Sequence, residues 1–239
     1  MNKTKKILIL GGGQAAAYAA KEIRLIDKNS DVTIISDEKY LPYEKPPLSK
    51  DYILDKVTFD DLLFFSENFY KENNIKFKGS TKITKVDFDN KKITSSLNTY
   101  EYDRLLITTG CSNRHLKING EIVLPEENII YLRNFEESNN LKNKINKAKS
   151  ITIIGGGFIG LEIASSALQK GKNVTILEKG EQLMGRVIPK QIADLILEKH
   201  ESEGTKINLN TQIKNIKKNN KTFKIYLNTN QILTSDLII

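Results

Sequence analysis

The sequence predicts an α/β protein in which one βαβ unit occurs twice. Each copy begins with a short apolar strand that ends in three glycines, at residues 6–13 and again at 150–157. An amphipathic helical pattern and a second apolar strand follow each glycine run. A polar stretch with strand-like alternation then leads into a further apolar strand. Because strands alternate with helices, both copies are expected to form parallel sheets.

The expected elements follow one another in the same order in both copies: strand, helix, strand, meander and closing strand. In the first copy they are expected at residues 6–10, 15–26, 32–36, 82–90 and 102–110. In the second copy they are expected at residues 150–154, 159–169, 174–178, 222–230 and 235–239. Between the copies, a linker is expected near residues 111–124, where Asn113, Asn119, Gly120 and Pro125 break the periodicity, and a helix near 135–148.

The boundary between the copies falls in this linker, which predicts domains at residues 1–114 and 115–239. The second copy stops at Ile239, before the Thr-Gly pair that follows the corresponding strand of the first copy. We therefore expect a chain truncated at its C-terminus. The alternative is a naturally short variant.

Composition excludes several classes of protein. Hydrophobic residues make up 39% of the chain and charged residues 28%, with no apolar run long enough for a membrane span. One Cys and two His argue against disulfides and a metal site, which favours the cytoplasm. The net charge of +8 comes from 32 Lys and 5 Arg scattered along the chain, which indicates compositional bias and no nucleic-acid partner.

The first glycine run fits a dinucleotide-binding turn. In Gly11-x-Gly13-x-x-Ala16, the first glycine permits the turn, the second lets the backbone approach a pyrophosphate, and Ala16 allows close packing of helix and strand. The helix N-terminus then faces the phosphates. An acidic residue should follow the second strand to bind ribose hydroxyls, and Asp37 and Glu38 stand there.

The second run, Gly155-x-Gly157-x-x-Gly160, is followed by Glu178 at the end of the next strand. A carboxylate there accepts hydrogen bonds from a free 2′-hydroxyl and repels a 2′-phosphate, which favours NADH over NADPH. Lys179 and Arg186 leave NADPH open, because a basic residue in this loop can tolerate the phosphate.

Two such units predict two Rossmann-like dinucleotide-binding domains, one for a flavin and one for a nicotinamide, with hydride passing between stacked rings. Spacing alone does not assign the two cofactors. The segment after the first acid, Leu41-Pro-Tyr-Glu-Lys-Pro-Pro-Leu-Ser-Lys50, is the distinctive one.

Together with the flanking motifs, this segment resembles the FAD-dependent NADH:ferredoxin reductases that serve oxygenases, the rubredoxin reductases and the related apoptosis-inducing factor. Lys45 stands where the family pattern P-Y-x-R-P-P-L-S-K has Arg, which keeps the charge and loses the bidentate fork. The resemblance covers the whole chain. It implies the three-layer ββα type of FAD/NAD(P)-binding domain, with the family's C-terminal interface domain absent.

The resemblance also implies which residues bind the cofactors. FAD is expected at Gly11, Gly12, Gly13, Gln14, Ala15, Asp37, Lys45 and Lys50, with Arg133 as a further contact. NADH is expected at Gly156, Gly157, Phe158, Ile159, Glu178 and Arg186.

Lys50 and Glu162 are the expected catalytic residues, because the resemblance implies that they pair beside the flavin N5 edge. A cation there favours the reduced flavin, and a carboxylate fixes the ammonium. The alternatives are a solvated loop lysine and a carboxylate on a helix surface. Phe158 resembles the aromatic residue that covers the flavin until the nicotinamide displaces it, and its alternative role is packing.

Residues 37–60 contain no Cys, whereas the disulfide reductases and peroxidases related to this family need one there. Electrons are therefore expected to leave for an external acceptor, a 2Fe-2S ferredoxin or a rubredoxin. The resemblance therefore implies an NADH:ferredoxin or rubredoxin reductase. The alternatives are a redox module that senses NADH, as in apoptosis-inducing factor, and an inactive fragment that retains only NADH binding.

Overall fold

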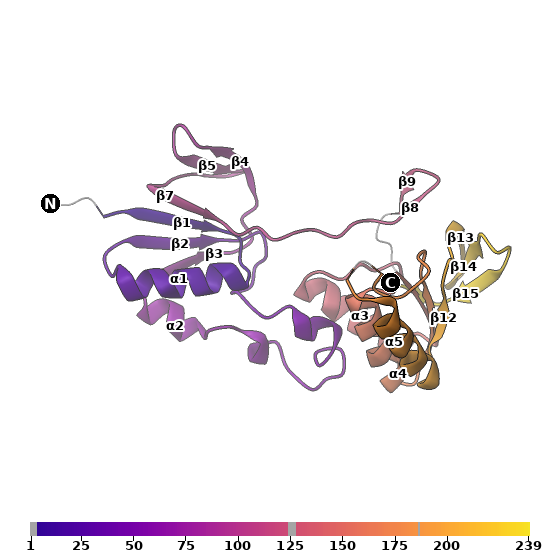
Figure 1. Cartoon of the computed structure of the whole chain (residues 1–239). Helices are drawn as coiled ribbons and strands as arrows, with labels where there is room; N and C mark the ends of the chain where they lie inside the picture. Colours follow the sequence, from indigo (N-terminus) through magenta and orange to yellow (C-terminus); the bar gives the residue numbers. More distant parts are fainter. Residues whose placement is uncertain (1–3, 124–127, 186) are drawn as a thin grey trace. The chain divides into compact units, whose positions relative to one another are not determined.

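The structure is a computed structural model and describes residues 4–123, 128–185 and 187–239 (Figure 1). Contacts divide the chain into two units. The first comprises the residues up to Glu44 together with Phe59–Cys111, and the second comprises Lys45–Thr58 together with Ser112–Ile239. The chain therefore passes from one unit to the other three times.

The first unit contains a parallel sheet of four strands in the order β3-β2-β1-β7. These strands are β1 (Lys6–Leu10), β2 (Asp31–Ile35), β3 (Ile75–Lys78) and β7 (Arg104–Ile107). The remaining elements are helices α1 (Gln14–Ile26) and α2 (Glu67–Glu72), the 3-10 helix η2 (Asp60–Leu62), and the meander β4 (Ile83–Asp87), β5 (Lys92–Ser95) and β6 (Thr99–Glu101).

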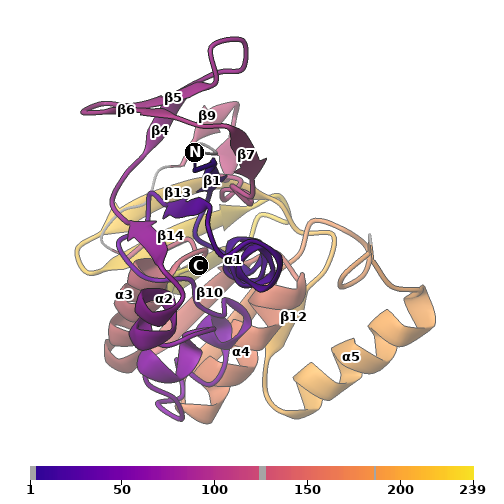
Figure 2. The same cartoon turned by 90° about the vertical axis from the view of Figure 1, so that its left-hand side faces the viewer.

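Alternation along the strands gives this unit three layers, since successive side chains point to opposite faces of a sheet. Leu8 packs in the cluster that contains Ile93 of the meander. The next residue, Ile9, packs in the cluster that contains Ala16 and Ala20 of α1. Figures 1 and 2 show the meander on one side of the sheet and the helices on the other, with α1 seen end-on in Figure 2.

The second unit repeats this plan with strand order β12-β11-β10-β16. Its parallel strands are β10 (Ser150–Ile154), β11 (Asn173–Leu177), β12 (Lys206–Asn208) and β16 (Leu237–Ile238). Its helices are α3 (Phe135–Lys147), α4 (Phe158–Gln169) and α5 (Lys190–Ser202). Its meander is β13 (Ile213–Asn219), β14 (Thr222–Leu227) and β15 (Ile232–Ser235), which packs on the sheet through Phe223, Ile225 and Leu227. The predicted three-layer α/β fold is thus confirmed in both copies.

Residues 45–58 leave the first unit and pack with the second. They begin with the 3-10 helix η1 (Pro46–Ser49), in which the two prolines occupy the first positions. Proline is tolerated there because its missing N–H would be unpaired in any case. This division by contacts differs from the predicted division at residue 114. Which residues serve which cofactor stays a prediction.

The predicted linker near residues 111–124 contains a β-hairpin, which the prediction did not include. Strands β8 (Lys117–Ile118) and β9 (Glu121–Ile122) pair antiparallel across Asn119 and Gly120, which have φ of 52° and 86°. Asn-Gly readily adopts two positive φ angles, which a type I′ hairpin turn requires. Pro125 lies outside the described residues.

None of the helices in the described part of the chain has the length and apolar character that crossing a membrane requires.

A buried arginine joins the helices of the first unit. Arg24 of α1 is only 4% exposed. Its guanidinium donates to the carbonyl oxygens of Asn73 and Asn74 at 2.7 and 2.8 Å and to that of Ser30 at 2.9 Å. Asn73 is the C-cap of α2, where carbonyl oxygens lack helical partners and a cation is favoured.

Replacing this side chain should therefore destabilise the fold. Arg24→Met is expected to lower the free energy of unfolding by about 2–4 kcal/mol, because one buried and two partly buried carbonyl groups lose a charged donor. Urea unfolding followed by circular dichroism measures the change. The matched control is Arg104→Met on β7, where the arginine is exposed and should alter stability by less than about 0.5 kcal/mol. Equal effects of the two substitutions would contradict the structural role of Arg24.

Candidate active site

The glycine turn of the second unit joins β10 to α4. Gly155 has φ +109°, a conformation that side chains rarely adopt, and its N–H donates to the carbonyl of Leu177. A Cβ on Gly160 would lie 2.2 Å from the Gly155 oxygen, so helix and turn approach too closely for any side chain. A Cβ on Gly157 would meet no atom within 4 Å. A Cβ on Gly155 would also meet no atom within 4 Å, but its positive φ disfavours a side chain, so Gly157, the N-cap of α4, is the glycine with both open space and an ordinary φ.

The first unit has the same arrangement at Gly11–Gly13. Gly11 has φ +114°, and a Cβ there would lie 2.2 Å from the Thr108 oxygen. Gly13 faces open space, and Gln14 and Ala15 are exposed in the first turn of α1. Neither α1 nor α4 has a side-chain cap among the described residues. Their first N–H groups can therefore bind a pyrophosphate, and both turns fit a dinucleotide.

Glu178 holds the glycine turn of the second unit. Its Oε2 accepts a hydrogen bond from the Gly156 N–H at 2.7 Å, and its Oε1 accepts one from the Gly180 N–H at 2.6 Å. Each carboxylate oxygen can accept a further bond. The side chain is thus fixed by the backbone and keeps capacity for ribose hydroxyls.

In the first unit, Ser36 takes the place that Glu178 takes in the second. Leu10 pairs with Ile35 as Ile154 pairs with Leu177, so Ser36 is the next residue along β2. A Cβ on Gly12 would lie 2.5 Å from the Ser36 hydroxyl oxygen. Asp37 follows and is exposed, while Glu38 accepts a hydrogen bond from the Tyr43 hydroxyl. The sequence analysis did not single out Ser36, because an acid was sought there.

Lys50 and Glu162 form an ion pair within the second unit. The Lys50 Nζ lies 2.9 Å from the Glu162 Oε1, and the two side chains are 42% and 30% exposed. The Ser49 hydroxyl donates to the other carboxylate oxygen, Oε2, at 2.5 Å. The two predicted catalytic residues therefore touch, and Lys50 keeps solvent-facing donors.

Phe158 and Ile159 begin α4 and are 55% and 47% exposed. They line an apolar cleft of about 600 Å³ at the carboxyl ends of β10 and β16, the edge at which α/β folds bind ligands. The cleft is further lined by Arg114, Leu116, Ile129–Leu132, Ile153–Gly155, Gly157, Gly160, Ile163, Ile238 and Ile239. Because Phe158 is 55% exposed, its alternative role in packing is not supported.

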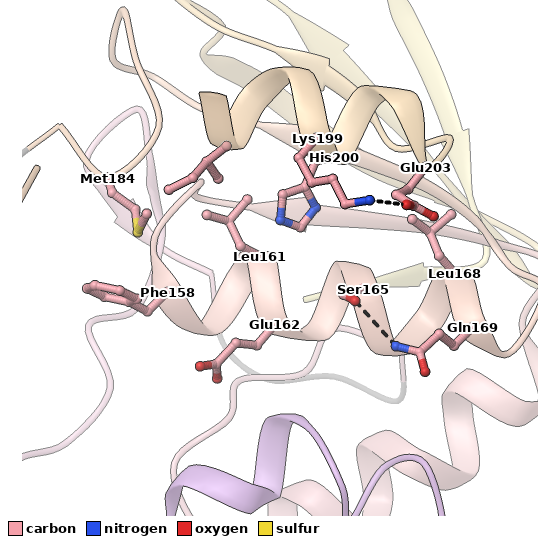
Figure 3. A pocket seen from close by; sticks show the side chains of 11 residues that line it. Phe158, Leu161, Glu162, Ser165, Leu168, Gln169, Met184, Lys199, His200 and Glu203 are labelled. Carbon is pink, nitrogen blue, oxygen red and sulfur yellow. Dashed lines mark hydrogen bonds and ion pairs between the residues drawn. The ribbon is translucent and has the colours of Figure 1, made fainter. Parts of the chain in front are cut away.

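A second cavity of about 650 Å³ lies between α4 and α5 (Figure 3). Phe158 and Glu162 line it from α4, and Lys199 and His200 line it from α5. Burial lowers the pKa of His200, so the imidazole is neutral at neutral pH. The sequence pattern gave no indication of this cavity, because it depends on how two helices pack.

The remaining predicted residues divide between the units. Lys45 precedes η1 and Arg133 precedes α3, and both belong to the second unit with Lys50. The predicted FAD residues Gly11–Ala15 and Asp37 belong to the first unit. Arg186 lies outside the described residues.

Two glycine turns, each opening a helix after a parallel strand, and a lysine–glutamate pair beside one of them define a two-dinucleotide oxidoreductase fold. The family model for pyridine nucleotide-disulphide oxidoreductases matches residues 5–239. The chain belongs to this family.

The chain is similar in sequence to reductases of ferredoxin and rubredoxin. The chain is 32% identical over 238 residues to the ferredoxin–NAD(+) reductase component of 3-phenylpropionate/cinnamic acid dioxygenase from Photorhabdus laumondii, covering 99% of the chain and 59% of the relative. It is 32% identical over 235 residues to the rubredoxin-NAD(+) reductase of Pseudomonas putida, covering 98% and 60%. The chain thus spans about three fifths of these relatives' length.

The structure is similar to the reductase in the crystal structure of the covalent putidaredoxin reductase–putidaredoxin complex. The TM-score is 0.93 at 26% identity, and the match covers 100% of the chain and 58% of that chain. The chain therefore shares its fold with the matched part of that reductase.

The two kinds of glycine in the second turn predict different outcomes of substitution. Gly160→Ala places a methyl group against the Gly155 carbonyl and is expected to cost about 1–3 kcal/mol of unfolding free energy. Gly157→Ala points its methyl group into open space and should cost less than about 1 kcal/mol. Urea unfolding of both variants measures this difference. A Gly157→Ala variant that is the less stable of the two would contradict the geometry of the turn.

Proposed function

We propose that this chain carries the FAD-binding and NADH-binding portion of an NADH:ferredoxin or rubredoxin reductase. The observation that carries the proposal is the contact between Lys50 and Glu162 in a chain with two open glycine turns. The names of the relatives, which are reductases of ferredoxin-type and rubredoxin partners, support the same activity.

The second unit would bind NADH. The N–H groups at the start of α4 would bind the pyrophosphate, with Gly156, Gly157 and Ile159 as the residues that the resemblance implies there. Glu178 accepts hydrogen bonds from the ribose hydroxyls with its remaining lone pairs and repels a 2′-phosphate. Arg186 completes this proposed set. The nicotinamide would lie in the apolar cleft beside Phe158.

The first unit would bind FAD at its own glycine turn, in the order that the resemblance implies: Gly11, Gly12, Gly13, Gln14, Ala15 and Asp37. Lys45, Lys50 and Arg133 are the further FAD residues that the resemblance implies. When bound, FAD supplies the ability to accept a hydride and release single electrons. Lys50 would supply a positive charge to the flavin, and Glu162 holds its Nζ through the ion pair at 2.9 Å.

The electron acceptor would be a 2Fe-2S ferredoxin or a rubredoxin. The absence of Cys between residues 37 and 60 supports an external acceptor, and the net charge of +8 suits an acidic one. A cytoplasmic location belongs to the same proposal.

One experiment tests both cofactor sites. The chain is purified with added FAD and desalted, its visible spectrum is recorded, and NADH is added without oxygen. Bound flavin that bleaches with NADH supports the proposal. A colourless protein that still binds NADH overturns flavin chemistry for this chain, and a protein that binds neither overturns the proposal as a whole.

The open face of Gly157 predicts how NADH binding responds to substitution. Gly157→Ala is expected to raise the dissociation constant for NADH more than about tenfold, which is about 1.4 kcal/mol, because the methyl group occupies the space of the pyrophosphate. A fluorescence titration with NADH measures it. The matched control is Gly13→Ala, which places the same methyl group in the first unit and should leave NADH affinity unchanged. An equal loss of NADH affinity in both variants would contradict the assignment of NADH to the second unit.

A further inference from the structure

Two buried serines hold the backbone just before Lys50. The hydroxyl of Ser138, on α3, donates to the Leu48 carbonyl at 2.6 Å. The hydroxyl of Ser166, on α4, donates to the Ser49 carbonyl at 2.9 Å. Consecutive carbonyl groups of residues 45–58 are therefore bound by two different helices, and the main chain at Lys50 is fixed.

Farther along the same segment, Asp55 adds a third attachment. Its carboxylate lies 2.5 Å from the Lys142 Nζ of α3 and 2.7 Å from the Lys170 Nζ, directly after α4. Hydrogen bonds from Lys142 and Lys170 lower the pKa of Asp55, so the clamp stays charged at neutral pH. The backbone carrying Lys50 thus has partners on both sides.

The Lys50 side chain lacks comparable support from packing. It is 42% exposed, and a lysine stem has four rotatable carbons. Its ion-pair partner is Glu162, whose side chain is itself 30% exposed. The position of the Nζ therefore depends on how firmly the Glu162 carboxylate is held.

Ser49 supplies that hold. It is only 4% exposed, and its hydroxyl lies 2.5 Å from the Glu162 Oε2. A hydroxyl has one proton, and the Pro46 carbonyl lies farther away, at 3.3 Å. The proton therefore goes to the carboxylate, in a charge-assisted hydrogen bond of the short and strong kind.

We propose that Ser49 is a positioning residue of the redox site: it fixes Glu162, which holds the Lys50 ammonium in place. Two successive residues, Ser49 and Lys50, bind the two oxygens of one carboxylate, and this sets the plane of the carboxylate as well as its distance. The inference rests on the proposed function for its catalytic meaning. The contact itself exists in the chain without any cofactor.

The first test uses the chain without FAD or NADH. Acetylation of each lysine by an amine-reactive reagent is followed by mass spectrometry in wild type, Ser49→Ala, Glu162→Ala and the double variant. Ser49→Ala is expected to raise the labelling rate of Lys50 severalfold, because the carboxylate no longer holds the ammonium. When Glu162 is already replaced by alanine, Ser49→Ala should cause no further increase in the labelling rate of Lys50. Unchanged Lys50 labelling, or an equal increase in both backgrounds, overturns the proposal.

Two controls separate positioning from loss of structure. Lys170 keeps its partner Asp55, so its labelling should stay constant in every variant. Ser235→Ala removes another fully buried hydroxyl of the second unit, which donates to the Leu237 carbonyl, and should leave Lys50 labelling unchanged. If Ser49→Ala does not fold, Ser49→Cys keeps the volume, weakens the donor and should shift Lys50 labelling in the same direction.

The second test connects the contact to catalysis. In FAD-loaded chain, the rate of flavin bleaching by NADH should fall in Ser49→Ala and show no further fall when Ser49→Ala is added to Glu162→Ala. A Ser49→Ala variant with raised Lys50 labelling and the wild-type bleaching rate overturns the positioning role. A wild-type chain that does not bleach at all overturns the proposed function, and the labelling result then still decides whether Ser49 holds Lys50.

Discussion

The Glu162 carboxylate joins two parts of the chain that lie 112 residues apart in sequence. Through this carboxylate, residues 45–58, which interrupt the first unit in sequence, attach to the second unit. The electrostatic reason is that a partly buried carboxylate requires donors, and the Pro-Pro-Leu-Ser-Lys50 turn supplies a hydroxyl and an ammonium in succession. The location of the site's positive charge depends on this contact.

The two units have the same glycine turn, but different side chains contact it. In the second unit, a glutamate after the strand binds the N–H groups of Gly156 and Gly180. In the first, a serine fills the space beneath Gly12. In both units the glycine turn closely approaches the residue that follows the second strand. Only in the second unit is that residue, Glu178, charged. The same turn geometry is therefore compatible with a charged or a neutral side chain after the second strand of the unit.

The sequence predicted most of the layers because burial on both faces of a strand and glycine at positive φ leave direct traces in residue pattern. The helix after Gly157 and the strand before Gly155 needed no tertiary information. The hairpin at Asn119 and Gly120 had a local signal, which was overlooked among residues interpreted as a linker. The roles of Ser36 and Ser49 could not be predicted, because they arise from contacts between segments that are distant in sequence, and a serine carries no pattern of its own.

The interleaved order of the units has a consequence for folding. The partners of residues 45–58 include Ser138, Lys142, Ser166 and Lys170, which lie about a hundred residues later. Contacts over such separations carry a large loop-closure entropy, so they form late and slow the folding of the chain. During synthesis, residues 45–58 are made before residues 138–170, so their partners are not yet present while the remaining strands of the first unit are made. Attachment of the segment that carries Lys50 is thus expected late in folding, and it makes the placement of Lys50 depend on completion of the second unit.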